Sequence, residues 1–338
     1  MTLPRDDGFF MPAEWAPHSR CWMAWPCREA VWGDHLDMAR EAYAEVANAI
    51  AAFEPVTMIA NPENLAEASL KCGTGVACLP IPHDDSWTRD TGPSFLINDR
   101  GELGGVAWQF NAWGGKYSNY EKDSKVASAI LQHLELPVFL GDMILEGGSI
   151  HVDGEGTLLT SEQCLLNPNR NPNLSRSDIE EKLRGYLGVK SIIWLNQGLV
   201  DDETDGHVDN LACFAAPGVV LALSCDDPND ENYAALQDNI SRLRASSDAK
   251  GRPLEVIEVP QPARMNNDQG ERLSRSYINF YIANGGIVMP SFEDSQDSRA
   301  LDIIAGAFPD RSVVSVSATD ITFGGGGIHC ITQQQPLV

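Results

Sequence analysis

The stretch Ser149-Ile150-His151-Val152-Asp153-Gly154-Glu155-Gly156-Thr157-Leu158-Leu159-Thr160 predicts a β-hairpin with Asp-Gly-Glu-Gly as its turn. Beyond it, Ser175 is a candidate N-cap for a helix that ends at Gly188, and residues 191–195 form a further apolar strand pattern. The order of these elements is strand, strand, helix, strand. This stretch therefore predicts one ββαβ unit.

The same order recurs along the chain, which indicates internal repetition without residue identity. The alternative is an ordinary α+β protein whose elements happen to alternate. Because the order holds over nearly the whole length, we predict an α/β fold of five ββαβ units closed into a ring, as a single domain over residues 1–338. The other predicted units are strands 94–97 and 105–110, helix 117–134 and strand 138–140; strands 211–214 and 219–223, helix 228–243 and strand 254–259; strands 277–283 and 287–289, helix 298–308 and strand 313–317; and strand 21–25, helix 36–53 and strand 56–60, completed by the strand that contains Cys330.

The composition restricts the possible partners. The 338 residues include 48 acidic and 24 basic side chains, for a net charge of -24, which argues against binding to nucleic acid or to an anionic membrane. The apolar runs are too short for a membrane span, and the N-terminus lacks the pattern of a secretion signal. Eight cysteines without a CxxC pair are typical of reduced thiols. We expect a cytoplasmic protein, and a homodimer is common for soluble enzymes of this size.

The loops that join the predicted units carry the side chains that could take part in catalysis or binding. In a closed ring, equivalent loops meet at one mouth, so these side chains are expected to converge. Four consecutive glycines precede one of them and leave the backbone open to close approach. The alternative for that loop is a sharp turn before an ordinary buried cysteine. The converging residues are Asp90, Glu146, His207, Asp209 and, after Gly324-Gly325-Gly326-Gly327, Cys330.

A thiol beside an imidazole can act as a nucleophile with a general base, but this pair alone fits many enzymes. The nearby acids are more specific. Carboxylates such as Asp90 and Asp209 can pair bidentately with the N–H edges of a planar guanidinium, whereas a protease has no use for them. Alternatively, both aspartates cap turns and His207 is structural.

A zinc site is a further alternative, because His207, Asp209, Asp90 and Cys330 are all possible ligands. The sequence lacks the HExxH and CxxC spacings that usually accompany such sites, so we expect no metal and no organic cofactor. In an extended segment His329 would point away from Cys330, so we do not assign it the base role. His151 lies in the predicted hairpin, and we expect a structural role for it.

Several motifs span nearly the whole chain: Met11 to His18, Trp87-Thr88-Arg89-Asp90-Thr91-Gly92-Pro93, Trp113 to Lys116, Glu146 to His151, Asn167 to Pro172, Gly206 to Asn210, and Gly324 to Cys330. In these motifs the chain resembles agmatine deiminases of the bacterial-type peptidyl-arginine deiminase family, within the guanidino-group-modifying superfamily. The resemblance implies a five-bladed α/β propeller. It also implies Cys330 as nucleophile, His207 as acid and base, Glu146 as a third catalytic residue, and Asp90 and Asp209 as the guanidinium clamp.

The implied reaction is hydrolytic deimination of agmatine, a small cation, to N-carbamoylputrescine and ammonia, through a covalent amidino-thioether and without a cofactor. Trp87, Trp113 and Gly327 are expected to contact the substrate, and Glu203, in an acidic run, is expected to bind the distal amine. Free or C-terminal peptidyl arginine is the alternative substrate. An amidinotransferase and a catalytically silent polyamine-binding protein are the other classes that the same residues allow.

Overall fold

The computed structural model describes residues 3–267 and 269–338. Its strands form five small mixed sheets, and four of them have three strands each. In each of these four, the first pair is antiparallel and the second pair is parallel. The strands are β4 (Ser94–Ile97), β5 (Leu103–Gln109) and β6 (Val138–Ile144); β7 (His151–Val152), β8 (Thr157–Ser161) and β9 (Ser191–Leu195); β10 (Ala212–Ala216), β11 (Val219–Ser224) and β12 (Glu255–Pro260); and β13 (Tyr281–Ala283), β14 (Gly286–Ser291) and β15 (Ser312–Ser317).

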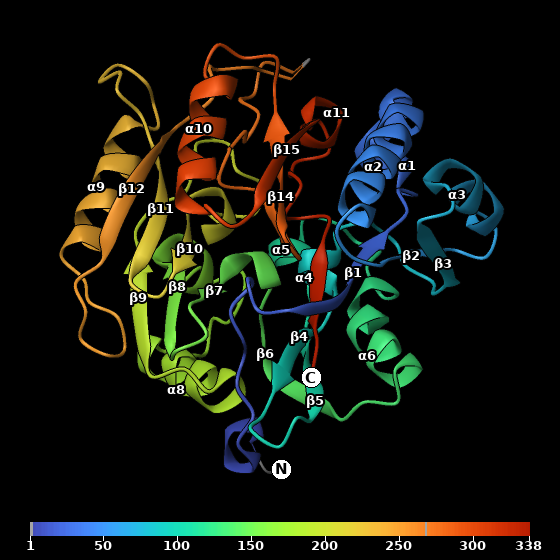
Figure 1. Ribbon diagram of the computed structural model, residues 1–338, viewed down its shortest axis with the longest axis horizontal. Coiled ribbons are helices and arrows are strands. Elements are labelled where there is room, and N and C mark those ends of the chain that lie inside the picture. The colour runs from blue at the N-terminus through green and yellow to red at the C-terminus, as the bar shows by residue number, and fades with distance from the viewer. Residues whose placement is uncertain (1–2, 268) are drawn as a thin grey trace.

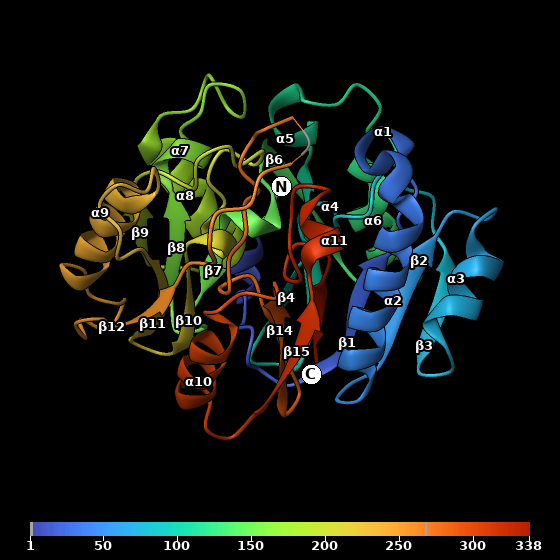
Figure 2. The same ribbon diagram turned by 90° about the horizontal axis from the view of Figure 1, so that it is seen from above.

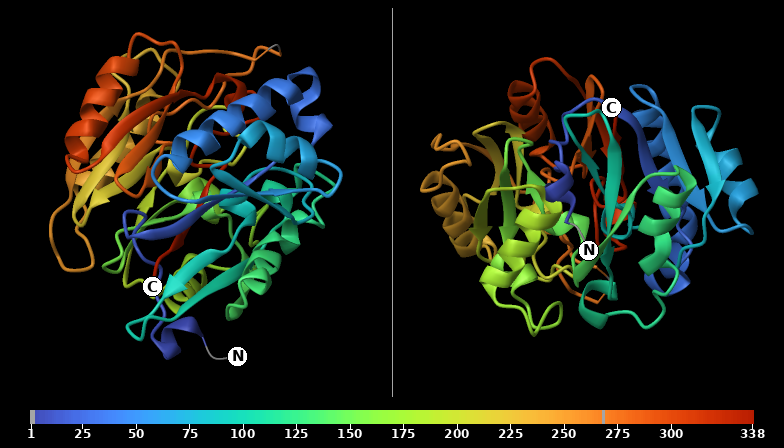
Figure 3. Two further views of the ribbon diagram at one scale, coloured as in Figure 1. Left: turned by 45° about the vertical axis from the view of Figure 1, so that its right-hand side comes forward. Right: turned by 90° about the horizontal axis from the view of Figure 1, so that it is seen from below.

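The fifth sheet joins the two ends of the chain. Its order is β16-β1-β2-β3, and β16 runs antiparallel to β1, with Gln334 opposite Cys21. Figure 3 shows this red C-terminal strand beside the blue N-terminal strand. The predicted return of the chain to its first unit is confirmed, but Cys330 itself lies in a turn and not in a strand. The strands of this sheet are β16 (Gln333–Pro336), β1 (His18–Ala24), β2 (Val56–Ala60) and β3 (Val76–Pro80).

Five longer helices connect the parallel strands of the five sheets. Figure 1 shows α6, α8, α9 and α10 toward the periphery, with the short α4 near the middle. A further helix and strand, α3 and β3, were not predicted; they lie at the edge of the molecule opposite α9 (Figure 2). The long helices are α2 (Leu36–Ala51), α6 (Asp123–His133), α8 (Arg176–Leu187), α9 (Tyr233–Arg244) and α10 (Asp297–Ala307), and the added one is α3 (Leu65–Cys72).

Helix α8 shows how the sequence sets these boundaries. The Ser175 hydroxyl accepts from the backbone N–H of Asp178, and the Asp178 carboxylate accepts from the backbone N–H of Ser175, which is a capping box. Gly188 ends the helix with a φ of 68°, a conformation that favours glycine. Ile179 and Leu183 are buried beneath the helix. The helix predicted from these signals is confirmed.

Three elements were predicted to begin several residues before they do in the structure. In each case polar contacts accompany the later start. Helix α6 begins at Asp123 because that carboxylate accepts from the backbone N–H groups of Asp84 and Asp85, at 2.7 and 3.0 Å. Helix α9 begins at Tyr233, after a loop in which Asp230 binds Arg272. Strand β13 begins at Tyr281 because the preceding residues bind the loop that carries Cys330.

Short helical turns occupy the junctions between the units, where the candidate side chains lie. Backbone contacts hold them together: the N–H of Arg89 donates to the carbonyl of Cys330 at 3.1 Å. In the part of the chain that the structure describes, no helix has both the length and the apolar character to cross a bilayer. The short turns are η1 (Pro4–Asp7), α1 (Glu29–Trp32), η2 (Gly33–His35), α4 (Thr88–Thr91), α5 (Ala112–Gly115), η3 (Gly147–Ser149), α7 (Glu162–Leu165), η4 (Val208–Asn210) and α11 (Thr319–Thr322).

Candidate active site

Cys330 lies in the turn after the polyglycine loop and is 4% exposed. Its Sγ accepts a hydrogen bond from Nδ2 of Asn279 at 3.2 Å and lies 3.5 Å from Oδ2 of Asp209. Burial and the nearby carboxylates of Asp209 and Asp90 raise the pKa of the thiol well above its usual value. The free protein therefore holds Cys330 as a neutral thiol at pH 7.

His207 follows Gly206, whose φ of 88° turns the chain into η4. The ring is fully buried, and neither nitrogen has a hydrogen-bond partner among the described residues. Nδ1 lies 3.8 Å from Oδ1 of Asp90, and Nε2 lies 3.8 Å from Oε2 of Glu146. Burial opposes the charged ring, but the neighbouring carboxylates, Asp90 first, outweigh it and raise the pKa of His207 well above its usual value. The ring is therefore a proton donor at neutral pH.

Asp90 and Asp209 are buried and face the same point. Oδ2 of Asp90 accepts from the indole N–H of Trp113 at 2.9 Å, and its Oδ1 accepts from the backbone N–H of Gly148 at 2.9 Å. A methyl group built on Gly148 would lie 2.6 Å from Nδ1 of His207, 2.9 Å from Oδ2 of Asp209 and 3.0 Å from Oδ1 of Asp90. The predicted convergence of these three side chains is therefore a feature of the structure.

Asp209 keeps one oxygen without a partner. Its Oδ2 is 2.9 Å from Nδ1 of His329, while Oδ1 is buried and has no hydrogen-bond partner among the described residues. A buried carboxylate oxygen without a donor is costly, and native structures usually supply one. A ligand that brings N–H groups would satisfy it.

Glu146 is held by Arg170, a residue of the Asn167 to Pro172 motif for which no role was predicted. Nε of Arg170 donates to Oε1 of Glu146 at 2.8 Å, and Nη2 donates to the carbonyl of Thr204 at 2.9 Å. Burial alone would raise the pKa of Glu146, but His207 and Arg170 outweigh it and lower the value. Glu146 is therefore ionised beside His207.

A pocket beside this cluster is lined by residues that include Cys330, Asp90, Trp87, Trp113 and Glu203, whereas His207, Asp209 and Glu146 lie outside its lining. Trp87 stacks on Trp32 with ring centroids 5.6 Å apart, which fixes one wall. The lining also includes Lys116 and Tyr117, whose hydroxyl donates to Oε2 of Glu203 at 3.1 Å. No pocket role was predicted from the sequence for Tyr117, Lys116 or Thr204, which also line the pocket.

Gly327 lies outside the lining residues, which instead include Gly324, Gly325 and Gly326. A methyl group on Gly327 would lie 2.5 Å from Oδ1 of Asn279, so this glycine allows close packing behind the nucleophile loop. Its predicted contact with substrate remains a prediction.

His329 has a supporting position that the sequence did not reveal. Its Nδ1 faces Asp209, and its Nε2 lies 2.9 Å from Oε1 of Glu14, which in turn accepts from Nη1 of Arg89 at 3.1 Å. The segment is a turn and not the extended one on which the expected orientation depended, and the His329 ring and the Cys330 thiol both lie near Oδ2 of Asp209, at 2.9 and 3.5 Å.

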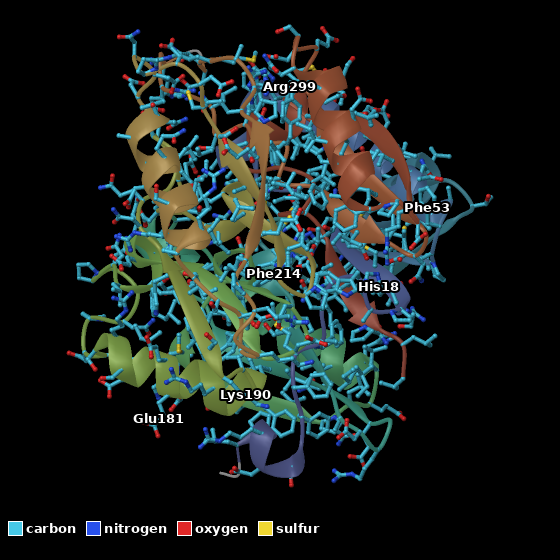
Figure 4. The ribbon with its side chains drawn as sticks, turned by 60° about the vertical axis from the view of Figure 1, so that its left-hand side comes forward. His18, Phe53, Glu181, Lys190, Phe214 and Arg299 are labelled. Atoms are coloured by element: carbon cyan, nitrogen blue, oxygen red, sulfur yellow. The ribbon has the colours of Figure 1, made fainter. Side chains whose placement is uncertain are left out.

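His151 accepts from the backbone N–H of Phe214 through Nδ1 at 3.3 Å. Phe214 is fully buried and lies in the interior, whereas Glu181 and Arg299 lie at the periphery (Figure 4). This position agrees with the structural role predicted for His151.

The four zinc ligands considered from the sequence do not form a group with close donor atoms in the described part of the chain. One different group does: Glu146, Cys164 and His207, whose potential ligand atoms all lie within 4.8 Å of one another.

The chain belongs to the Porphyromonas-type peptidyl-arginine deiminase family, whose family model matches residues 10–336. Two relatives named agmatine deiminase, from Stutzerimonas stutzeri and Pseudomonas aeruginosa, are 49% and 48% identical over 99% of this chain and 97% of each relative. The solved agmatine deiminase of Enterococcus faecalis has a TM-score of 0.96 at 39% identity and covers 100% of this chain and 98% of its own. A Campylobacter jejuni agmatine deiminase, solved as a C315S variant with substrate bound, has a TM-score of 0.89 at 30% identity, with 97% and 96% covered.

Proposed function

We propose that the protein hydrolyses agmatine to N-carbamoylputrescine and ammonia, through a covalent intermediate on Cys330. The observation that carries the proposal is the buried cluster of Cys330, His207, Asp90 and Asp209 beside a pocket that Cys330 and Asp90 line, with an unpartnered Asp209 oxygen. The family and the agmatine deiminases among its relatives support the reaction class. A catalytically silent binding protein would have no need for both the thiol and the protonated imidazole.

Binding starts with the guanidinium. Asp90 and Asp209 accept its N–H groups, and Oδ1 of Asp209 gains the donor that it lacks. The indole of Trp87 offers an apolar wall to the cation. The bound positive charge opposes the effect of both aspartates on Cys330, so the pKa of the thiol falls. The thiol then loses its proton to solvent as substrate binds, because His207 is already protonated, and the thiolate forms.

The chemistry then has two stages. Sγ of Cys330 forms a bond to the guanidinium carbon, and His207 donates its proton to the departing nitrogen, which leaves as ammonia. A water molecule next attacks the amidino carbon and gives one proton to His207. The C–S bond then breaks to release the thiolate, and the remaining hydroxyl proton passes to solvent, which leaves the neutral ureido product. Glu146, 3.8 Å from Nε2, stabilises the protonated ring.

The choice of agmatine depends on the far end of the pocket. Glu203 suits the distal ammonium of agmatine, whereas free arginine or a C-terminal arginine brings a carboxylate. Lys116 also lines the pocket, which favours the arginine alternative. However, Nζ of Lys116 lies 3.9 Å from Oδ1 of Asp205, which offsets its charge. We therefore favour agmatine.

The repeated sheets and the pairing of β16 with β1 also support a closed five-bladed α/β propeller, with residues 1–338 as a single catalytic domain. Such an arrangement explains why the junction loops meet at one point. The homodimer and the cytoplasmic location remain predictions from the sequence.

The test is ammonia release from agmatine, arginine and a C-terminal-arginine peptide, assayed side by side with a Cys330→Ala variant. Turnover of agmatine alone, lost in the variant, is expected. Turnover of arginine or the peptide alone would retain the mechanism and reject the substrate. Activity that survives Cys330→Ala would reject the thiol mechanism, and a ureido-free product formed only with an acceptor amine would indicate an amidinotransferase.

A further inference from the structure

A second thiol lies behind His207, on the side of Glu146. Oε2 of Glu146 is 4.0 Å from Sγ of Cys164 and 3.8 Å from Nε2 of His207. All three side chains are fully buried, and the three donor atoms lie within 4.8 Å of one another. The proposed deimination gives Cys164 no role.

The donor atoms of this group are not engaged with one another by good hydrogen bonds. Separations of 3.8 and 4.0 Å exceed the usual range, and Nε2 of His207 has no partner among the described residues. Buried polar atoms are usually satisfied, so an unpartnered nitrogen aimed at a thiol and a carboxylate calls for an explanation.

The surroundings match those of a metal ligand set. Metal-binding histidines commonly present their second nitrogen to a carboxylate, and ligating carboxylates are themselves hydrogen-bonded. Here Nδ1 of His207 faces Asp90 at 3.8 Å, and Oε1 of Glu146 accepts from Arg170 at 2.8 Å, so Nε2 and Oε2 remain available.

The distances and charges are also suitable. Tetrahedral zinc with thiolate, imidazole and carboxylate ligands places ligand atoms about 3.3–3.6 Å apart, so each side chain needs to move by well under about 1 Å. With Cys164 as thiolate, the negative charges of Cys164, Glu146 and Asp90 equal the positive charges of the divalent ion and Arg170. Three protein ligands leave the fourth position for water.

We propose that Glu146, Cys164 and His207 form an inhibitory site for a thiophilic divalent cation of the zinc class. Coordination of Nε2 puts the ion in place of the proton on that nitrogen, so the imidazolium that the proposed reaction uses cannot form and turnover stops. The inhibitory consequence rests on the proposed function, whereas metal binding itself does not. Because the ligands are fully buried, we expect inhibition to develop slowly during preincubation.

The first experiment measures binding directly and needs no enzyme activity. Cobalt(II) is added to the Cys330→Ser protein, which removes the nucleophile as a ligand, and thiolate-to-metal charge-transfer absorbance is recorded with the stoichiometry. One ion per chain with this band is expected, and the band should disappear when Cys164→Ala is added to Cys330→Ser. Absence of the band in Cys330→Ser, or its persistence after the second change, would overturn the site.

The second experiment measures inhibition of ammonia release by zinc after preincubation, with magnesium as the control ion. Cys164→Ala should keep its activity without metal and raise the inhibitory zinc concentration at least tenfold, whereas Cys225→Ala, at another buried cysteine, should keep the parent sensitivity. Thermal unfolding verifies folding, and Cys164→Ser replaces the alanine variant if that one unfolds. Unchanged zinc sensitivity at position 164, or activity that requires added metal, would overturn the inhibitory role.

Discussion

Replacement of Asn279 by aspartate tests how the thiol is prepared for attack. Nδ2 of Asn279 donates to Sγ of Cys330 at 3.2 Å, while its Oδ1 accepts from the backbone N–H groups of His329 and Cys330, at 2.9 and 3.3 Å. Asn279→Asp retains the acceptor that holds the loop and removes the donor to sulfur. The variant therefore separates loop positioning from thiolate stabilisation.

The magnitude follows from the lost donor. A hydrogen bond to a charged group contributes about 1.5–3 kcal/mol, and one pKa unit corresponds to about 1.4 kcal/mol. We expect the pKa of Cys330 to rise by about one to two units from the lost donor alone, and the new carboxylate adds to this rise. At a pH below that pKa, kcat for agmatine should fall by about 10- to 100-fold, since only the thiolate attacks.

The assay is the pH dependence of Cys330 alkylation by iodoacetamide, followed by mass spectrometry of its peptide, together with kcat. Asn210→Asp is the matched control, because Oδ1 of Asn210 accepts from Asn279 at 3.0 Å and its charge lies one residue farther from sulfur. A smaller shift is expected there. An unchanged alkylation profile and kcat in a well-folded Asn279→Asp protein would refute the reasoning.

Three further predictions concern the pocket and its support. Gly148→Ala places a methyl group 2.6 Å from Nδ1 of His207. The value of kcat should therefore fall at least about 100-fold, comparable to loss of a general acid, with little change in thermal unfolding. A kcat near that of the parent would contradict the described geometry. Glu203→Gln should lower kcat/KM for agmatine by about 2- to 5-fold, the scale of an exposed charge pair, because Glu203 is exposed, and should leave arginine turnover unchanged. Equal losses on both substrates would reject its role with the distal amine. The pKa values of Glu14 and Asp209 are lowered in the fold, so their stabilisation is present above pH about 4–4.5 and is lost as the pH falls through the lowered values. Urea unfolding between pH 7 and 3 should therefore show a smaller acid loss for Asp209→Asn than for the parent, and parallel curves would count against this linkage.

The order of elements could be predicted because hairpin turns, caps and apolar periodicity are local signals. Element α3 and its strand β3 were missed, since they stand outside the repeated unit. Tyr117 was assigned to a helix, but a loop places its hydroxyl on Glu203. For Tyr117, a polar contact far along the chain decided the local conformation.

Residues of the candidate site could be predicted where the reaction itself requires a particular side chain. Residues that only support such a side chain through a hydrogen bond could not be predicted. Asn279 is 51 positions from Cys330, and Glu14 is 315 positions from His329, so no local pattern links them. The polyglycine loop could be identified from the sequence, but positive φ is the smaller of the two reasons for its glycines. Only Gly325 of the four has a positive φ, whereas a methyl group on Gly324 would lie 2.3 Å from the ring of Trp32. Glycine is needed in this loop more for close packing against the pocket walls than for backbone conformation.

The charges buried around the site suggest when Cys330 ionises. Burial is outweighed by the carboxylates around both His207 and His329, which raises the pKa of each ring. Four buried carboxylates, Glu14, Asp90, Glu146 and Asp209, lie among these rings, Arg89 and Arg170, and Arg170 also binds Asp205. A thiolate at Cys330 would add a further negative charge beside Asp90 and Asp209, and a bound guanidinium adds one positive charge that this thiolate cancels. We therefore expect thiolate absorbance in the ultraviolet at neutral pH only when a non-hydrolysable guanidinium compound is bound to the unmodified protein. The Cys330→Ser variant serves as the blank. The same absorbance in the free protein would show that the ion pair exists before substrate arrives and would reject the charge-balance argument.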